Sequence, residues 1–100
     1  MFRGTTPTHI FTTDIDLRGA PVIYVTYSQN DTAVLEKTQA DLTEVTDSQI
    51  TLQLSQEDTL KFAQNVPVEI QIRARTALGK AVASTIMKTT AARILKDGVI

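Results

Sequence analysis

Residues 66–75 (VPVEIQIRAR) alternate strictly between apolar and polar side chains. Val68, Ile70, Ile72 and Ala74 fall on one face of an extended chain, and charged or amide side chains fall on the other. A period of two is typical of a β-strand with one buried and one solvent-facing side. The segment therefore predicts a sheet whose apolar face packs against a second layer.

Two further segments support this prediction. Residues 49–54 (QITLQL) repeat the alternation, and residues 21–27 (PVIYVTY) are apolar on both faces, which is typical of a central strand. Threonine, valine and isoleucine make up a third of the chain. Because these β-branched side chains fit a pleated sheet better than a helix, the composition favours a mostly β domain.

One short helix interrupts the strand pattern, over residues 56–63. Ser55 is a favoured N-cap, and Asp58 stands at the third helical position, so that the pair resembles a capping box. Pro67 stops the helix after about two turns. We predict that it carries the chain from a strand ending at Leu54 to one starting at Val66, and from one sheet to the other.

These elements predict a single domain, residues 1–100, that is all-β and mainly antiparallel: an immunoglobulin-like β-sandwich with one short crossover helix. A last strand within residues 80–90 should pair with residues 66–75; its inward set is taken as Val82, Ser84 and Ile86, although Met87 fits the opposite phase. The last ten residues fit either a helical turn or an irregular strand. The predicted core is Ile23, Val25, Ile50, Leu52, Leu54, Leu60, Val68, Ile70, Ile72 and Ile86.

The residue types argue against an enzyme and against a metal or cofactor site. His9 is the only histidine, and we expect it on the surface of an edge strand. Asp14 and Asp16 have the spacing of some calcium ligands but lack the glycine and glutamate of a complete loop, so a turn capped by aspartate is the better interpretation. Glu57 and Asp58 are adjacent on a helix and would diverge, which leaves them a capping role.

The charges do not point to nucleic acid or membranes as partners. Ten basic and eleven acidic side chains leave a net charge of −1. Arg73 and Arg75 would form a basic stripe with Lys80 and Lys88, but Glu69 interrupts it and neither strand carries a stacking aromatic ring. No apolar run has the length of a secretory signal or a membrane span. We therefore expect a protein made in the cytoplasm whose sheet face meets solvent or a protein neighbour.

Two tyrosines are candidates for a protein interface. Tyr24 and Tyr27 lie on opposite faces of one predicted strand, so that there is room for one in the core while the other reaches the surface. The candidate interface residues are Tyr24, Tyr27, Arg73 and Arg75.

The order of motifs along the chain resembles a family of small structural proteins of phages and prophages of Gram-positive bacteria, particularly Firmicutes. The most specific parts are RGTTPTH near the start and LSQEDTL followed by VEIQIR; a hairpin ending in AS before an apolar-basic strand also matches. The strand–QEDTLKF–strand order is similar, more loosely, to the N-terminal domain of phage baseplate upper proteins.

This resemblance implies a role by assembly. It implies a non-enzymatic virion protein, made in the bacterial cytoplasm and built into the phage particle, associated with the tail, baseplate or neck. Its partners would be other virion proteins and copies of itself. A head decoration protein and a free module that binds a host protein or glycan are the alternative interpretations.

Overall fold

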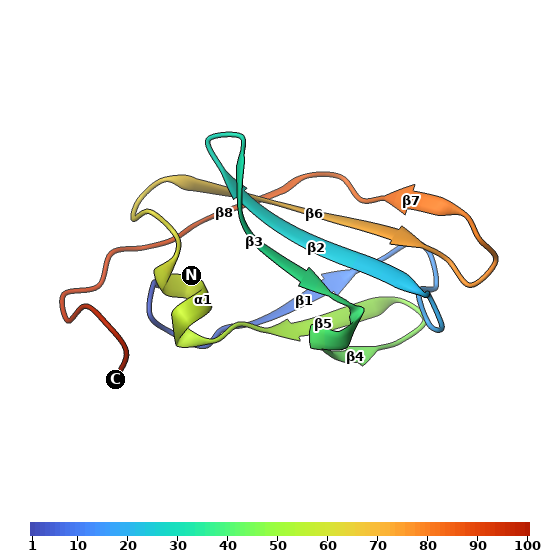
Figure 1. Cartoon of the computed structure of the whole chain (residues 1–100), viewed down its shortest axis with the longest axis horizontal. Helices are drawn as coiled ribbons and strands as arrows, with labels where there is room; N and C mark the ends of the chain where they lie inside the picture. The colour runs from blue at the N-terminus through green and yellow to red at the C-terminus, as the bar shows by residue number, and fades with distance from the viewer.

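The computed structural model describes all 100 residues and contains eight strands in two sheets (Figure 1). The strands are β1 (Thr8–Thr12), β2 (Val22–Gln29), β3 (Thr32–Thr38), β4 (Leu42–Val45), β5 (Gln49–Gln53), β6 (Pro67–Arg75), β7 (Ala81–Ala83) and β8 (Met87–Thr90). A 3₁₀ turn (Gln39–Asp41) precedes β4, and the helix α1 (Gln56–Leu60) joins β5 to β6. No helix is both long enough and apolar enough to cross a membrane.

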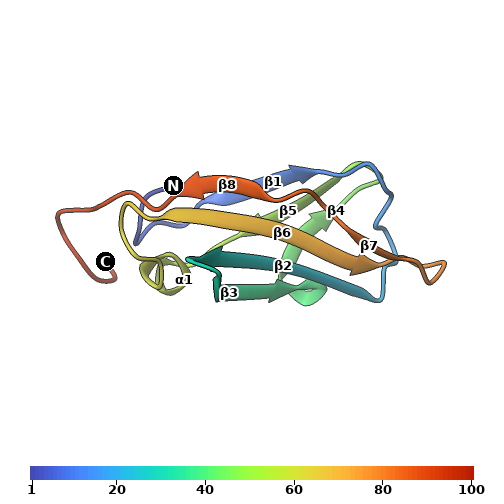
Figure 2. The ribbon, with the colours of Figure 1, turned by 90° about the horizontal axis from the view of Figure 1, so that it is seen from above.

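The two sheets pack face to face as an all-β sandwich (Figure 2). One sheet has the order β1-β5-β4, and the other has the order β3-β2-β6, with β7 and β8 both pairing with the far edge of β6. All pairings between these strands are antiparallel. The mainly antiparallel all-β sandwich predicted from the sequence is therefore confirmed, and the two strand orders follow the immunoglobulin-type arrangement.

The core lies between the sheets and follows the alternation of the strands. Along β6 every second residue from Val68 to Ala74 is buried, and the residues between them face outward. The fifteen buried hydrophobic residues form one cluster: Phe11, Leu17, Ile23, Val25, Tyr27, Leu35, Ile50, Leu52, Leu54, Phe62, Val68, Ile70, Ile72, Ala74 and Ala91. Eight of the ten residues assigned to the core from the sequence belong to it; the exceptions are Leu60 and Ile86.

The helix α1 crosses between the sheets and is capped by Ser55 and Asp58. The Ser55 hydroxyl accepts the Asp58 N–H at 3.1 Å, and the Asp58 carboxylate accepts the Ser55 N–H at 3.0 Å. The helix is shorter than predicted because Gln29 binds both backbone groups of Ala63, at 2.8 and 2.9 Å. The chain therefore leaves the helix early and turns Phe62 into the core.

The assignment of Leu60 to the core is wrong, because its side chain is only partly buried. Thr59 and Phe62 take the buried positions beside α1, and Leu60 is only half-buried. Its side chain lies next to Gly4 in the segment that precedes β1. A helix of a little over one turn buries only one side, and Leu60 falls at its margin.

The assignment of Ile86 to the core is also wrong, because the last strand is broken. Arg73 pairs with Ala83, whereas Ile70 pairs with Met87, so that one extra residue lies between β7 and β8. An extra residue shifts the alternation by one and exchanges the two faces. Met87 therefore packs against the core, and Ile86 is 54% exposed on the outer face.

Candidate functional site

The outer face of the five-stranded sheet carries the candidate interface residues. Tyr24 on β2 and Arg73 on β6 are directly opposite each other in the pairing register, and Arg75 lies opposite Val22. Tyr24 is 41% exposed, and both arginines are exposed. Because β2 and β6 are neighbours in the middle of the sheet, these side chains share one continuous surface, which we call the sheet face.

Two shallow depressions mark the sheet face, and Arg73 lines both of them. The first, of about 210 Å³, lies between Tyr24 and the Arg75 end of β6. The second, of about 160 Å³, lies beside Thr26 and Gln71 and is bordered by Ile86. The break between β7 and β8 thus places the exposed side chain of Ile86 in the same depression as Arg73.

The charges on the sheet face are mixed. Glu69 lies opposite Lys88 on β8, and Glu36 extends from β3 beside Thr26. Neither Arg73 nor Arg75 takes part in a salt bridge within the chain. Their guanidinium groups are therefore available to carboxylates or carbonyl groups of another molecule.

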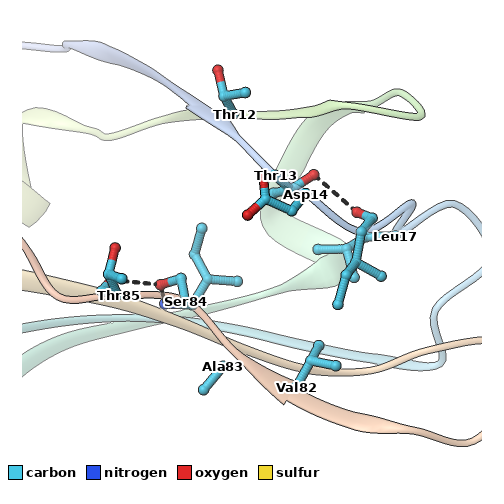
Figure 3. Close-up of a pocket in the computed structure, with 10 residues that line it drawn as sticks. Thr12, Thr13, Asp14, Leu17, Val82, Ala83, Ser84 and Thr85 are labelled. Atoms are coloured by element: carbon cyan, nitrogen blue, oxygen red, sulfur yellow. Dashed lines mark hydrogen bonds between the residues drawn. The ribbon is translucent and has the colours of Figure 1, made fainter.

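A second concave site lies at the edge of the sandwich, between the end of β1 and the break after β7. We call this site the edge cleft; its volume is about 250 Å³. Figure 3 shows one wall formed by Thr12, Thr13, Asp14 and Leu17, and the opposite wall formed by the segment from Val82 to Thr85. The sequence gives no sign of this cleft, because its two walls come from segments near opposite ends of the chain.

Two of the four hydroxyl groups that line the edge cleft, those of Thr13 and Ser84, have partners within the chain. Thr13 Oγ1 donates to the Ile15 carbonyl at 3.0 Å. Ser84 Oγ donates to the Thr85 carbonyl at 2.8 Å and accepts the Ile72 N–H at 2.9 Å. Asp14 has no hydrogen bond or salt bridge through its carboxylate, so it is the free charged group at this site.

Tyr27 is not an interface residue, since its side chain is fully buried between the sheets. Its hydroxyl lies 2.7 Å from His9 Nδ1, and its ring packs 5.8 Å from the ring of Phe62. Burial raises the pKa of the Tyr27 phenol well above its ordinary value. Tyr27 therefore stays protonated and serves the core, and of the two tyrosines only Tyr24 reaches the surface.

His9 is not a simple surface residue, contrary to expectation. It lies on the edge strand β1, as expected, but its ring is half-buried against Tyr27 and Phe11. Burial lowers the pKa of His9 below its ordinary value, and the positive N-terminus adds to this effect. The neutral imidazole is thus the form that the fold favours.

Asp58 joins the helix cap to the five-stranded sheet. Its carboxylate lies 3.0 Å from Lys37 Nζ on β3, and both side chains are largely buried, at 11% and 20% exposed. Burial by itself would raise the pKa of Asp58, but the Ser55 N–H and Lys37 outweigh it and lower the pKa. Lys37 was not singled out from the sequence, because β3 alone gives no sign that a lysine points inward.

Of the two acidic residues after β1, Asp16 caps a turn. Asp16 accepts the Arg18 N–H at 2.9 Å and pairs with the Arg18 guanidinium at 2.6 Å. This contact lowers the pKa of Asp16. The chain contains no cluster of three or more histidine, cysteine or acidic side chains that could hold a metal ion.

No protein-family model matches the chain, and neither does any curated protein or solved structure. What the chain binds must therefore be inferred from its own surfaces.

Proposed function

We propose that this chain is a non-enzymatic structural protein of a phage particle, associated with the tail, baseplate or neck. It acts by binding other virion proteins and copies of itself. The protein is made in the bacterial cytoplasm and is then built into the particle.

The sheet face supports the part of this proposal that concerns binding to other proteins. Tyrosine and arginine are enriched at protein interfaces and at the residues that dominate their energy. Tyr24 and Arg73 are opposite each other at the centre of the sheet, and Ile86 adds an exposed apolar side chain at the second depression. A surface that combines an aromatic ring, free guanidinium groups and an isoleucine suits a protein partner.

Two further features support a role in assembly. The strand β1 pairs only with β5, so the backbone of its other edge is open to a strand from a neighbour. The net charge of −1 gives little repulsion between closely packed copies. The assignment to a phage particle itself rests on the sequence motifs RGTTPTH, LSQEDTL and VEIQIR.

The proposal is tested by peptide mass spectrometry of particles that are induced from the source strain, purified on a gradient and divided into heads and tails. We expect the chain in the tail fraction, at a copy number that fits a ring. Recovery with the heads would indicate a decoration protein instead. Absence from both fractions would contradict the proposal and favour a free binding module.

A paired set of variants tests the sheet face in the same particles. Arg73→Glu reverses a charge at the centre of the face and should remove the chain from purified particles. Lys61→Glu makes the matched change at an exposed position after α1 and should leave incorporation intact. Equal incorporation of both variants, with both folded, would show that the sheet face is not the contact.

A further inference from the structure

An anchored loop at one end of the molecule exposes an apolar side chain. We call residues 93–97 the end loop. Leu95 within it is 88% exposed, and basic side chains stand on both sides of it, at Arg93 and Lys96. Full exposure of one leucine is ordinary; the framework that holds this loop in place is what sets it apart.

Two contacts hold the end loop against the body, and a third holds the chain end that follows it. Arg3 donates to the carbonyls of Leu60 and Phe62 at the end of α1, and its guanidinium also reaches Asp97 at 3.5 Å. Ile94 packs against Gly4, where an added Cβ would lie only 2.9 Å from Ile94 Cδ1. Gln56 then binds both backbone groups of Ile100, at 2.8 and 3.2 Å.

These contacts fix the segment on either side of Leu95. A side chain that is presented on a fixed loop loses less conformational entropy on binding than one on a free tail. The end loop therefore presents the apolar side chain of Leu95 in a preorganised position between the basic residues Arg93 and Lys96.

The edge cleft has the complementary chemistry. Its walls include the side chains of Ile15, Leu17 and Val82, and the hydroxyl groups of Thr13 and Ser84 are already hydrogen-bonded within the chain. An apolar side chain that enters the cleft would displace water from these apolar walls. Asp14 at the rim is the one free carboxylate, and it suits a neighbouring lysine or arginine.

The end loop and the edge cleft lie toward opposite ends of a molecule that is 46 Å long. Figures 1 and 2 both place the C-terminal segment at one end and β7 toward the other. A chain therefore cannot fill its own cleft with its own Leu95. A second copy can, and it would leave its own cleft free for a third.

We infer that copies of this chain bind head to tail, with Leu95 of one copy in the edge cleft of the next and Lys96 or Arg93 beside Asp14. Such a contact is heterologous, so it generates a ring if the rotation closes and a filament if it does not. The inference deepens the proposed function by naming one partner, a second copy. Its test uses the purified chain, so its failure leaves the particle assignment to be judged by mass spectrometry.

Cysteine cross-linking tests the contact directly, because the chain contains no cysteine. A Leu95→Cys chain is mixed with a Thr85→Cys chain at high concentration under mild oxidation. We expect a disulfide-linked dimer of the two different chains. Leu78→Cys is the matched control, since Leu78 is 92% exposed on the β6–β7 loop and should give no such product with Thr85→Cys.

The outcomes separate the arrangements. Equal linking through positions 78 and 95, linking only between identical chains, or no linking at all would each overturn the head-to-tail contact. A chain that carries both Leu95→Cys and Thr85→Cys should form a ladder of oligomers or a closed ring under the same conditions.

Sedimentation of the cysteine-free chain gives the energetic test. Leu95→Asp should weaken self-association by about 10- to 100-fold, as expected for the lost burial of one leucine side chain. Leu78→Asp should have no effect. The charge reversal Asp14→Lys should also weaken association, and Lys96→Glu in the same chain should restore part of it; a lack of any rescue by Lys96→Glu or Arg93→Glu would contradict the pairing at the rim.

Discussion

His9 Nδ1 and Tyr27 Oη lie 2.7 Å apart and join the two sheets of the sandwich. His9 belongs to the edge strand β1 of one sheet, and Tyr27 belongs to β2 in the other. The only histidine of the chain thus contacts a fully buried tyrosine. The pair forms a polar contact between two sheets whose facing sides are largely apolar.

Tyr27→Phe removes this hydrogen bond but keeps the ring that packs on Phe62. We expect the free energy of unfolding to fall by about 0.5–1.5 kcal/mol, the usual net worth of one hydrogen bond. Tyr27→Ala should cost about 3–5 kcal/mol, because it also leaves a cavity. Denaturant unfolding of the two variants measures both values; equal losses would mean that the hydroxyl, and not the ring, holds the sheets together.

The half-buried position of His9 predicts a pH dependence of stability. Its pKa is lowered from the ordinary 6.5 in the folded state, so near that pH the unfolded chain binds a proton that the folded chain does not. The free energy of unfolding should therefore fall as the pH drops through 6.5 toward the pKa of folded His9.

His9→Gln should flatten the curve in this window. Asp58→Asn is the matched control, because the pKa of Asp58 is lowered from 3.8 and its contribution is lost only as the pH falls below that value. Denaturant unfolding over a pH series separates the two windows. An unchanged slope near pH 6.5 in His9→Gln would assign the effect to another group.

The helix cap gives a graded pair of variants. Ser55→Ala removes one capping hydrogen bond and should cost about 1 kcal/mol. Asp58→Ala removes the reciprocal bond and also leaves Lys37 largely buried without its partner, so we expect about 3–5 kcal/mol. If thermal or denaturant unfolding gave both variants the same loss, the contact to Lys37 would contribute nothing.

The sequence was sufficient for the fold because β5 and β6 carry a clear period of two, and because Ser55 and Asp58 mark the start of the helix between them. Those signals are local, and the structure retains them. The strand pairing follows from the order of such elements, since a crossover helix between two half-buried strands leads from one sheet to the other.

The sequence was insufficient where a contact joins distant segments. Which residues of β8 face the core depends on an extra residue that no local signal marks. The sequence therefore does not show whether Ile86 or Met87 points inward. The inward direction of Lys37 and the hydrogen bond of His9 each require a partner from the other layer. The edge cleft has the same origin, because its two walls lie about as far apart in the sequence as two strands can.

The phase of β8 can be tested with adjacent residues. Met87→Asp places a charge against the core and should destabilise the protein strongly, by several kcal/mol if the charge cannot reach water. Ile86→Asp lies on the outer face and should change the free energy of unfolding by less than about 0.5 kcal/mol. A larger loss of stability for Ile86→Asp than for Met87→Asp would indicate that Ile86, and not Met87, faces the core.

The two faces of β5 and β6 give the last prediction. Leu52→Ala and Ile70→Ala remove buried side chains and should each cost about 2–5 kcal/mol. Thr51→Ala should cost little, since the Thr51 side chain makes no hydrogen bond in the chain and only its carbonyl accepts one, from Thr43.

Gln71→Ala should lower the free energy of unfolding by more than Thr51→Ala and by less than Leu52→Ala or Ile70→Ala. The alternation with Ile70 and Ile72 alone would place Gln71 among the neutral positions. Gln71 Nε2 donates to the Ser84 carbonyl at 3.0 Å, at the break between β7 and β8. We therefore expect a loss of about 0.5–1.5 kcal/mol. Gln71→Glu keeps the size of the side chain but removes the donor, so urea unfolding of both variants distinguishes the hydrogen bond from packing. A neutral Gln71→Glu would show that the amide does not hold the break in place.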